Sequence, residues 1–157
     1  MIVADKFPIE LRKQKLKENL NPYVVLYLFC QFTHPLPKDK FLLLVSLKPE
    51  PLFFVVNSEM NDYVKNRPHL AKCHILLEKE KHHFLSHDSY INCNEAKSFS
   101  IEEVETQVLE NMGRIKGIVS KEIRLFIIEA TKASKTLSRE KKSIILESLQ
   151  LLYNYEQ

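Results

Sequence analysis

The segment HHFLSHDSYINCNEA concentrates side chains that can take part in chemistry. His82, His83, His87, Asp88 and Cys93 are all competent metal ligands. Their spacing matches neither HExxH nor a paired CxxC, and His83 and His87 would share a face only in a helix. The residues around them are strand-like. The pattern therefore favours a solvated loop that leads into a strand, and we expect neither a metal nor a cofactor.

The same segment places an imidazole, a carboxylate and a hydroxyl in a row, at His87, Asp88 and Ser89. Adjacent side chains of a strand point to opposite faces, so this tripeptide cannot form a catalytic triad by itself. At most one face of it joins a site built with other segments. The alternative is that Asp88 and Ser89 only hydrogen-bond the turn before a strand.

A second group of chemically competent residues is spread over three connections of the chain. Its members are His34, Lys38, Lys40, Asn57, Ser58, Arg67 and His69. Together they would line a basic groove that carries a hydroxyl. Cleavage of an RNA phosphodiester needs a base for the 2′-OH proton and a cation for the phosphorane charge. Phe32, Tyr63 and Phe84 lie nearby in the sequence and can stack on unpaired bases. The alternative is an ordinary polar rim.

Composition narrows the function classes further. The chain has 157 residues and a formal net charge of +3, with 45% hydrophobic and 27% charged residues. These values are typical of one globular domain. It has only two glycines, Gly113 and Gly117, which excludes the glycine-rich phosphate loops of P-loop enzymes and Rossmann dehydrogenases.

The three cysteines indicate a reducing compartment. Cys30, Cys73 and Cys93 are odd in number and lie in apolar patterns, which favours buried thiols over a disulfide framework. The first residues show no signal-peptide pattern, and the longest apolar runs are too short to span a bilayer. We therefore expect a cytoplasmic protein without a membrane segment.

Several elements must position these groups. Apolar runs rich in aromatic and β-branched residues predict five strands, at 23–32, 41–47, 52–56, 72–79 and 88–94. The KPEP segment predicts a tight antiparallel turn between the second and third runs. One short helical turn is predicted before Arg67-Pro68.

Helices are predicted at both ends of the chain. Residues 8–19 predict an amphipathic helix with Ile9, Leu11 and Leu16 as its apolar residues. Helices are also predicted at 100–111, 120–134 and 138–152, capped by Ser100, Ser120 and Ser138, with the glycine segment 113–119 as a bridge. Their inward residues would be Ile123, Phe126, Ile127 and Ala130, then Ile144, Ile145, Leu149 and Leu152.

Strands followed by helices predict an α+β fold over residues 1–157, with barrel strands in 22–94 and a helical part in 100–152. Closure hides sheet edges, so a small, partly closed antiparallel barrel is favoured over a flat sheet.

This layout resembles the MazF/PemK-type toxins, which are small SH3-like barrels. The resemblance covers roughly residues 22–134 and rests on KDKFLLLVSL, LFFVVNSE, DSYINCNE and the Gly113-Arg114-Ile115 segment before a capped helix. It implies a dimeric endoribonuclease of a toxin–antitoxin pair that cuts single-stranded RNA without a metal. The family's hydroxyl residue falls at Ser58. Its basic residue, an arginine, falls where this chain has Lys38-Asp39-Lys40.

On this resemblance, Lys40 and Ser58 are the predicted catalytic residues. His34, Lys38, Arg67, His69 and His87 are the predicted RNA-binding residues, and the partners would be RNA, an antitoxin and a second copy. The alternative is a non-catalytic protein-interaction domain on the same barrel, with helices 120–134 and 138–152 binding a partner.

Overall fold

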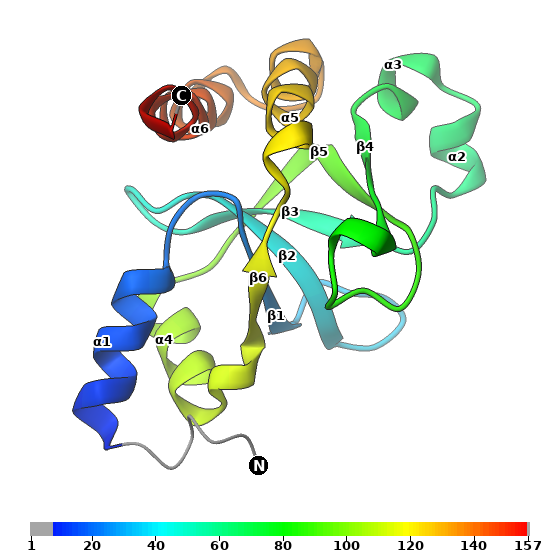
Figure 1. Ribbon diagram of the computed structural model, residues 1–157. Helices are drawn as coiled ribbons and strands as arrows, with labels where there is room; N and C mark the ends of the chain where they lie inside the picture. Colours follow the sequence, from blue (N-terminus) through cyan, green and yellow to red (C-terminus); the bar gives the residue numbers. More distant parts are fainter. Residues whose placement is uncertain (1–7, 157) are drawn as a thin grey trace.

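The structure, a computed structural model, describes residues 8–156; residues 1–7 and 157 lie outside the described residues. It is an α+β fold built on one antiparallel sheet (Figure 1). The strands are β1 (Val24–Cys30), β2 (Lys38–Ser46), β3 (Leu52–Asn57), β4 (His74–Leu77), β5 (Ser89–Ser98) and β6 (Ile115–Ile118). The sheet curls into a half-barrel with the strand order β4-β5-β3-β2-β1-β6.

Helices precede, interrupt and follow these strands. The α-helices are α1 (Ile9–Asn19), α2 (Asp62–Lys65), α3 (Pro68–Ala71), α4 (Ile101–Glu110), α5 (Lys121–Ala133) and α6 (Arg139–Glu156). Two 3₁₀ turns, η2 (Lys79–Lys81) and η3 (Met112–Arg114), join neighbouring elements. The predicted helices at both ends of the chain and all five predicted strands are confirmed.

The segment 113–119, predicted only as a bridge between two helices, contains a strand that was missed, β6 at residues 115–118. This strand pairs antiparallel with β1, where Val24 lies opposite Ile118 and Val25 opposite Gly117. Four residues around a glycine carry no periodic pattern of their own. Their conformation depends on a partner strand about ninety positions earlier, which local sequence does not reveal.

Both faces of the sheet are buried, which explains the near-continuous apolar runs of the central strands. On one face, Leu43 and Val45 join a core with Ile127 and Ile145 from α5 and α6. On the other face, the alternate residues of β2 join a second core with Leu16 of α1 and Val104 and Val108 of α4. Figure 1 shows α5 and α6 on one side of the sheet and α1 and α4 on the other.

Two predicted helix faces need correction. Phe126 was predicted to face inward, yet its side chain is 61% exposed, because α5 rests on the sheet through Ile123, Ile127 and Ala130 instead. In α1, only Leu16 is buried, while Ile9 and Leu11 remain partly exposed. A second short helix, α3, was missed. It begins at Pro68, where a proline in the first turn favours helix initiation although it ends the preceding turn.

The first residue of the barrel also anchors the last helix. Tyr23 has a φ of 75°, a left-handed conformation that is unfavourable for a tyrosine. Its fully buried ring lies under the Arg124 guanidinium at 4.7 Å, and its hydroxyl donates to the Leu149 carbonyl at 2.9 Å. These contacts hold the strained turn and fasten α6 to the start of β1.

Candidate functional site

The histidine-rich segment 82–88 serves mainly as structural support. His82 is 2% exposed and lies between two backbone groups. The Ser120 N–H donates to its Nε2 at 3.0 Å, and its Nδ1 lies 2.7 Å from the Glu78 carbonyl oxygen. Asp88 accepts a hydrogen bond from the Lys79 N–H at 2.9 Å, as expected of a residue that closes a turn. Cys93 is fully buried in the core under α5 and α6. Within residues 8–156, no three His, Cys, Asp or Glu side chains come together as a metal site.

A groove at the end of the barrel brings several predicted site residues together. We call it the β2–β3 groove. It has a volume of about 210 Å³ and is lined by Tyr27, Lys38, Asp39, Lys40, Phe41, Val56, Ser58, Leu85, Ser86, His87 and Ser89. Lys38, Ser58 and His87 come from β2, from the end of β3 and from the loop before β5. The curl of the sheet places these three segments side by side.

Aromatic rings form one wall of the groove. Tyr27 and Phe41 pack with ring centroids 4.8 Å apart, and Phe84 continues the cluster at 5.8 Å from Phe41. The wall therefore offers partly exposed aromatic surface beside cationic and hydroxyl groups, a combination suited to unpaired nucleotides.

The two predicted catalytic residues, Lys40 and Ser58, both line this groove. The Lys40 ammonium donates to Asn57 Oδ1 at 2.8 Å. Side chains alternate along a strand, and the neighbouring Phe41 packs on the α5–α6 side. By this alternation Lys38 and Lys40 share the α4 side of β2, where Lys40 meets Asn57, and Ser58 follows Asn57 at the end of β3. Lys40 and Ser58 therefore reach the same end of the barrel.

The environment of Lys40 disfavours its charge. Burial lowers the pKa of the Lys40 ammonium, and the like charge of Lys38 lowers it further, against a smaller opposing effect of Cys30. Asn57 offers a neutral amide oxygen and no counter-charge. An approaching phosphate would supply the missing negative charge.

His87 is the group in the groove best placed to take a proton. Its Nδ1 lies 3.0 Å from the Asp88 carbonyl oxygen, which can only accept, so Nδ1 carries the hydrogen. Nε2 then holds a free lone pair on an exposed side chain. Ser89 Oγ lies 3.5 Å from Nδ1 and helps to fix the ring. Nε2 is therefore the nitrogen of His87 that could exchange a proton with a bound substrate.

Three other predicted RNA-binding residues do not line this groove. His34 is exposed in the loop between β1 and β2. Arg67 stacks its guanidinium 3.6 Å from the centre of the Tyr63 ring and donates to the Tyr63 carbonyl at 2.9 Å. His69 is exposed on α3. Arg67 and His69 follow β3 closely in the sequence, but they lie at α3, away from the groove.

An ion pair beside the groove was missed. Arg114 Nη1 donates to Asp39 Oδ1 at 2.9 Å and to the Tyr27 carbonyl at 2.7 Å. Asp39 and Tyr27 also line an adjoining hollow of about 130 Å³ with Arg114 and Lys116. The glycine–arginine segment was visible in the sequence, but nothing local indicated that its arginine would meet an aspartate 75 positions earlier.

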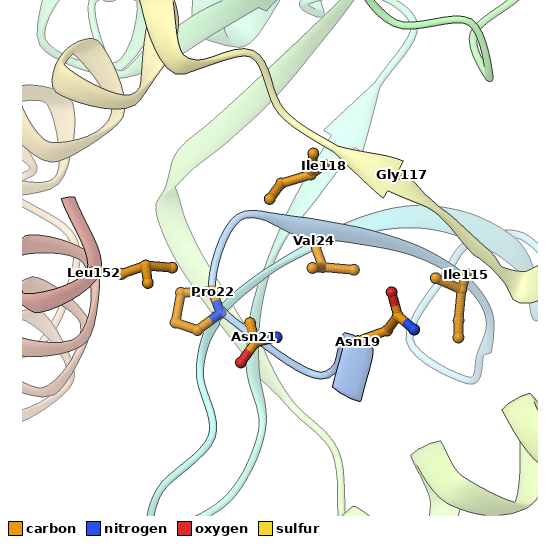
Figure 2. Close-up of a pocket in the computed structure, with 8 residues that line it drawn as sticks. All are labelled: Asn19, Asn21, Pro22, Val24, Ile115, Gly117, Ile118 and Leu152. Atoms are coloured by element: carbon orange, nitrogen blue, oxygen red, sulfur yellow. The ribbon is translucent and has the colours of Figure 1, made fainter. Parts of the chain in front are cut away.

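A further hollow of about 420 Å³ lies beside β6. Figure 2 shows Leu152 of α6 beside Pro22, with Val24, Ile115 and Ile118 along the strands and Asn19 and Asn21 at the rim. None of the residues lining it titrates. This hollow can hold apolar groups of a partner, but it has no acid or base for chemistry.

No known protein family matches this chain, and no curated protein is similar to it at a significant level. No helix within residues 8–156 is long and apolar enough to cross a membrane.

Proposed function

We propose that the β2–β3 groove binds single-stranded RNA and that the chain is a divergent MazF/PemK-like endoribonuclease. The observation that carries the proposal is the convergence of Lys38, Ser58 and His87 on one groove beside aromatic rings. Each comes from a different segment, and the three supply a cation, a hydroxyl and an imidazole. RNA cleavage by its own 2′-OH needs a base and a cation, and a hydroxyl can add a hydrogen bond to the phosphate.

In the proposed reaction, His87 Nε2 takes the proton of the 2′-OH. The 2′-oxygen then attacks the adjacent phosphorus and the 5′-oxygen leaves with a proton from solvent, which gives a 2′,3′-cyclic phosphate and a 5′-hydroxyl end. Lys38 and Lys40, which both line the groove, stabilise the phosphorane charge, and the Ser58 hydroxyl donates to a phosphate oxygen. The hydrogen bond from Lys40 to Asn57 Oδ1 would hold the ammonium in place for this role.

Cleavage of a mixed-sequence single-stranded RNA in excess EDTA tests the reaction. The wild-type protein should cut, and His87→Ala, Ser58→Ala and Lys40→Ala should each lose at least about tenfold in rate, a typical cost of removing an acid–base or charge-stabilising group. Lys135→Ala, an exposed lysine after α5, is the matched control and should keep full activity. Intact RNA at high protein concentration would reject cleavage, and a loss of activity in Lys135→Ala would reject the assigned site.

The remaining partners follow from the same resemblance. We propose an antitoxin protein as the natural inhibitor, a homodimer as the active form and the cytoplasm as the compartment. The buried thiols of Cys30, Cys73 and Cys93 support a reducing environment. Light scattering of the purified protein tests the dimer directly, since a monomeric mass at micromolar concentration would reject it.

A non-catalytic interaction domain is the second candidate. It is favoured by apolar side chains that α5 and α6 expose, Leu125 at 46%, Phe126 at 61% and Leu151 at 72%. Leu149, by contrast, is fully buried and cannot belong to such a surface, while Leu152 lies at the edge of the hollow beside β6. Loss of self-association in Phe126→Glu or Leu151→Glu, with RNA neither bound nor cut by the wild type, would favour this candidate.

A further inference from the structure

A second groove lies on the opposite side of the sheet from the α5–α6 layer. We call it the α1 groove. It has a volume of about 510 Å³, against about 210 Å³ for the β2–β3 groove. It is bounded by α1, the turn between β2 and β3, and the start of α4. Its floor is apolar and consists of Leu16, Leu20, Leu47, Pro49 and Ile101.

The rim of the α1 groove is basic. Lys13 and Lys17 stand four positions apart on α1 and therefore share one face of the helix. Lys48 faces them from the β2–β3 turn, and Glu105 is the one acidic residue among those lining the groove.

These lysines are available for a partner. Lys13 Nζ lies 3.8 Å from Glu10 Oε1, but both side chains are more than half exposed, so the pair is weak. Within residues 8–156, Lys17 and Lys48 have no ion-pair partner. The apolar hollow thus lies between Lys13, whose ion pair with Glu10 is weak, and Lys17 and Lys48, which have no ion-pair partner among residues 8–156.

We propose that the α1 groove binds an acidic, amphipathic segment of a partner protein. Apolar side chains of that segment would fill the floor, and its carboxylates would meet Lys13, Lys17 and Lys48 at the rim. Helix-in-groove recognition combines these two features, an apolar stripe in a hollow and a complementary charged edge. The inference does not rest on the proposed RNA chemistry, since it uses none of the residues of the β2–β3 groove.

Other anionic partners fit this groove less well. Its floor is aliphatic and offers no aromatic ring on which a base could stack, unlike the wall of Tyr27 and Phe41 in the β2–β3 groove. A membrane surface is planar and favours a convex apolar face, whereas here the apolar residues line a concave floor between helices. A protruding apolar side chain flanked by acids matches both shape and charge.

The experiment uses the full chain and two fluorescein-labelled synthetic helical peptides. The peptides share one leucine stripe, and their polar positions are glutamate in one and lysine in the other. Fluorescence anisotropy should show binding of the acidic peptide that weakens as salt is raised, with no binding of the basic peptide. The double variant Lys17→Glu/Lys48→Glu should bind the acidic peptide at least about tenfold more weakly.

Two further variants test whether peptide binding depends on the α1 groove. Lys15→Glu changes the same charge on α1, but Lys15 is exposed and does not line the groove, so this variant should bind like the wild type. Leu20→Ala shortens the floor and should weaken binding while the circular dichroism spectrum stays unchanged.

Four results would overturn the proposal. The first three are no binding of the acidic peptide, equal binding of both peptides, and an equal loss of binding in Lys15→Glu. The fourth is tighter binding to phosphatidylglycerol vesicles or to single-stranded RNA than to the acidic peptide, if Lys17→Glu/Lys48→Glu weakens that binding as well. Each result is distinct from a failure of RNA cleavage, which depends on the other groove.

Discussion

The backbone N–H of Ser120 donates to Nε2 of the buried His82 at 3.0 Å. Because Nε2 accepts, the neutral ring carries its proton on Nδ1, which donates to the Glu78 carbonyl at 2.7 Å. One imidazole thereby joins the loop after β4 to the start of α5. Nearby, Phe84 of the same loop approaches Gly117 of β6, so this loop bridges the two free edges of the half-barrel.

Replacing His82 should therefore cost stability. His82→Phe keeps an aromatic ring but leaves the Ser120 N–H and the Glu78 carbonyl without their partner, at a cost of about 1–3 kcal/mol for each buried group left unsatisfied. Urea unfolding measures the change in free energy. His83→Phe, at the exposed neighbouring position, is the control and should stay within about 0.5 kcal/mol of the wild type. Equal effects of the two substitutions would contradict the bridging role.

Helix capping distinguishes two serines that look equivalent in the sequence. Ser100 Oγ accepts from the Glu103 N–H at 3.1 Å, so Ser100→Ala should destabilise the fold by about 1 kcal/mol. Ser120 precedes α5 in the same way, but its hydroxyl makes no cap and has no hydrogen-bond partner among the described residues. Ser120→Ala should be neutral or slightly stabilising. Thermal unfolding of both variants beside the wild type measures the two effects. A larger loss for Ser120→Ala than for Ser100→Ala would refute the assignment.

A glycine is needed at position 117 because the Phe84 ring leaves no room for a side chain, and not because of its backbone angles. A Cβ there would lie 3.2 Å from two carbons of the Phe84 ring, which is itself packed against Phe41 and His82. Gly117→Ala should therefore cost about 1 kcal/mol or more through overpacking. In a double-mutant cycle measured by urea unfolding, Phe84→Leu should remove most of that cost. Strict additivity of the two changes would show that the contact does not matter.

We predict that the protein loses stability at high pH because Cys30 is buried. Burial raises the pKa of the Cys30 thiol to about 11, against a model-compound value of 9.0. A raised pKa in the folded state gives stability that is complete below the unfolded value and is lost as pH rises toward the folded one. The wild type should thus lose stability between about pH 9 and pH 11, and Cys30→Ala should lose less over that interval. Parallel pH profiles of the two proteins would disprove this contribution.

Asp39 should weaken RNA binding through its charge. Asp39 lines the β2–β3 groove, and Arg114 Nη1 contacts its Oδ1 at 2.9 Å. Asp39→Asn removes a negative charge beside the proposed phosphate path and frees the guanidinium. Filter binding should therefore show several-fold tighter RNA binding with a steeper salt dependence. Glu129→Gln, an exposed change on α5, should leave the affinity unaltered, and weaker binding by Asp39→Asn would oppose the proposed path.

The sequence by itself determined the elements whose signals are local. The central strands are apolar on both faces, because cores lie on both sides of the sheet, and so their runs were visible as strands. Ser100 and Ser138 marked two helix starts through hydroxyls that cap their own first turns. The sequence predicted a larger set of site residues, of which Lys38, Lys40, Ser58 and His87 line the β2–β3 groove.

Only the tertiary structure decided the rest. β6 exists because β1 lies beside it, and Arg114 meets Asp39 because the sheet brings two distant segments together. The outward direction of Phe126 depends on which stripe of α5 meets the sheet. The meeting of Lys40 with Asn57 follows from the antiparallel register of β2 and β3. Each of these outcomes is set by a partner far away along the chain, and propensity and periodicity act only over neighbouring residues.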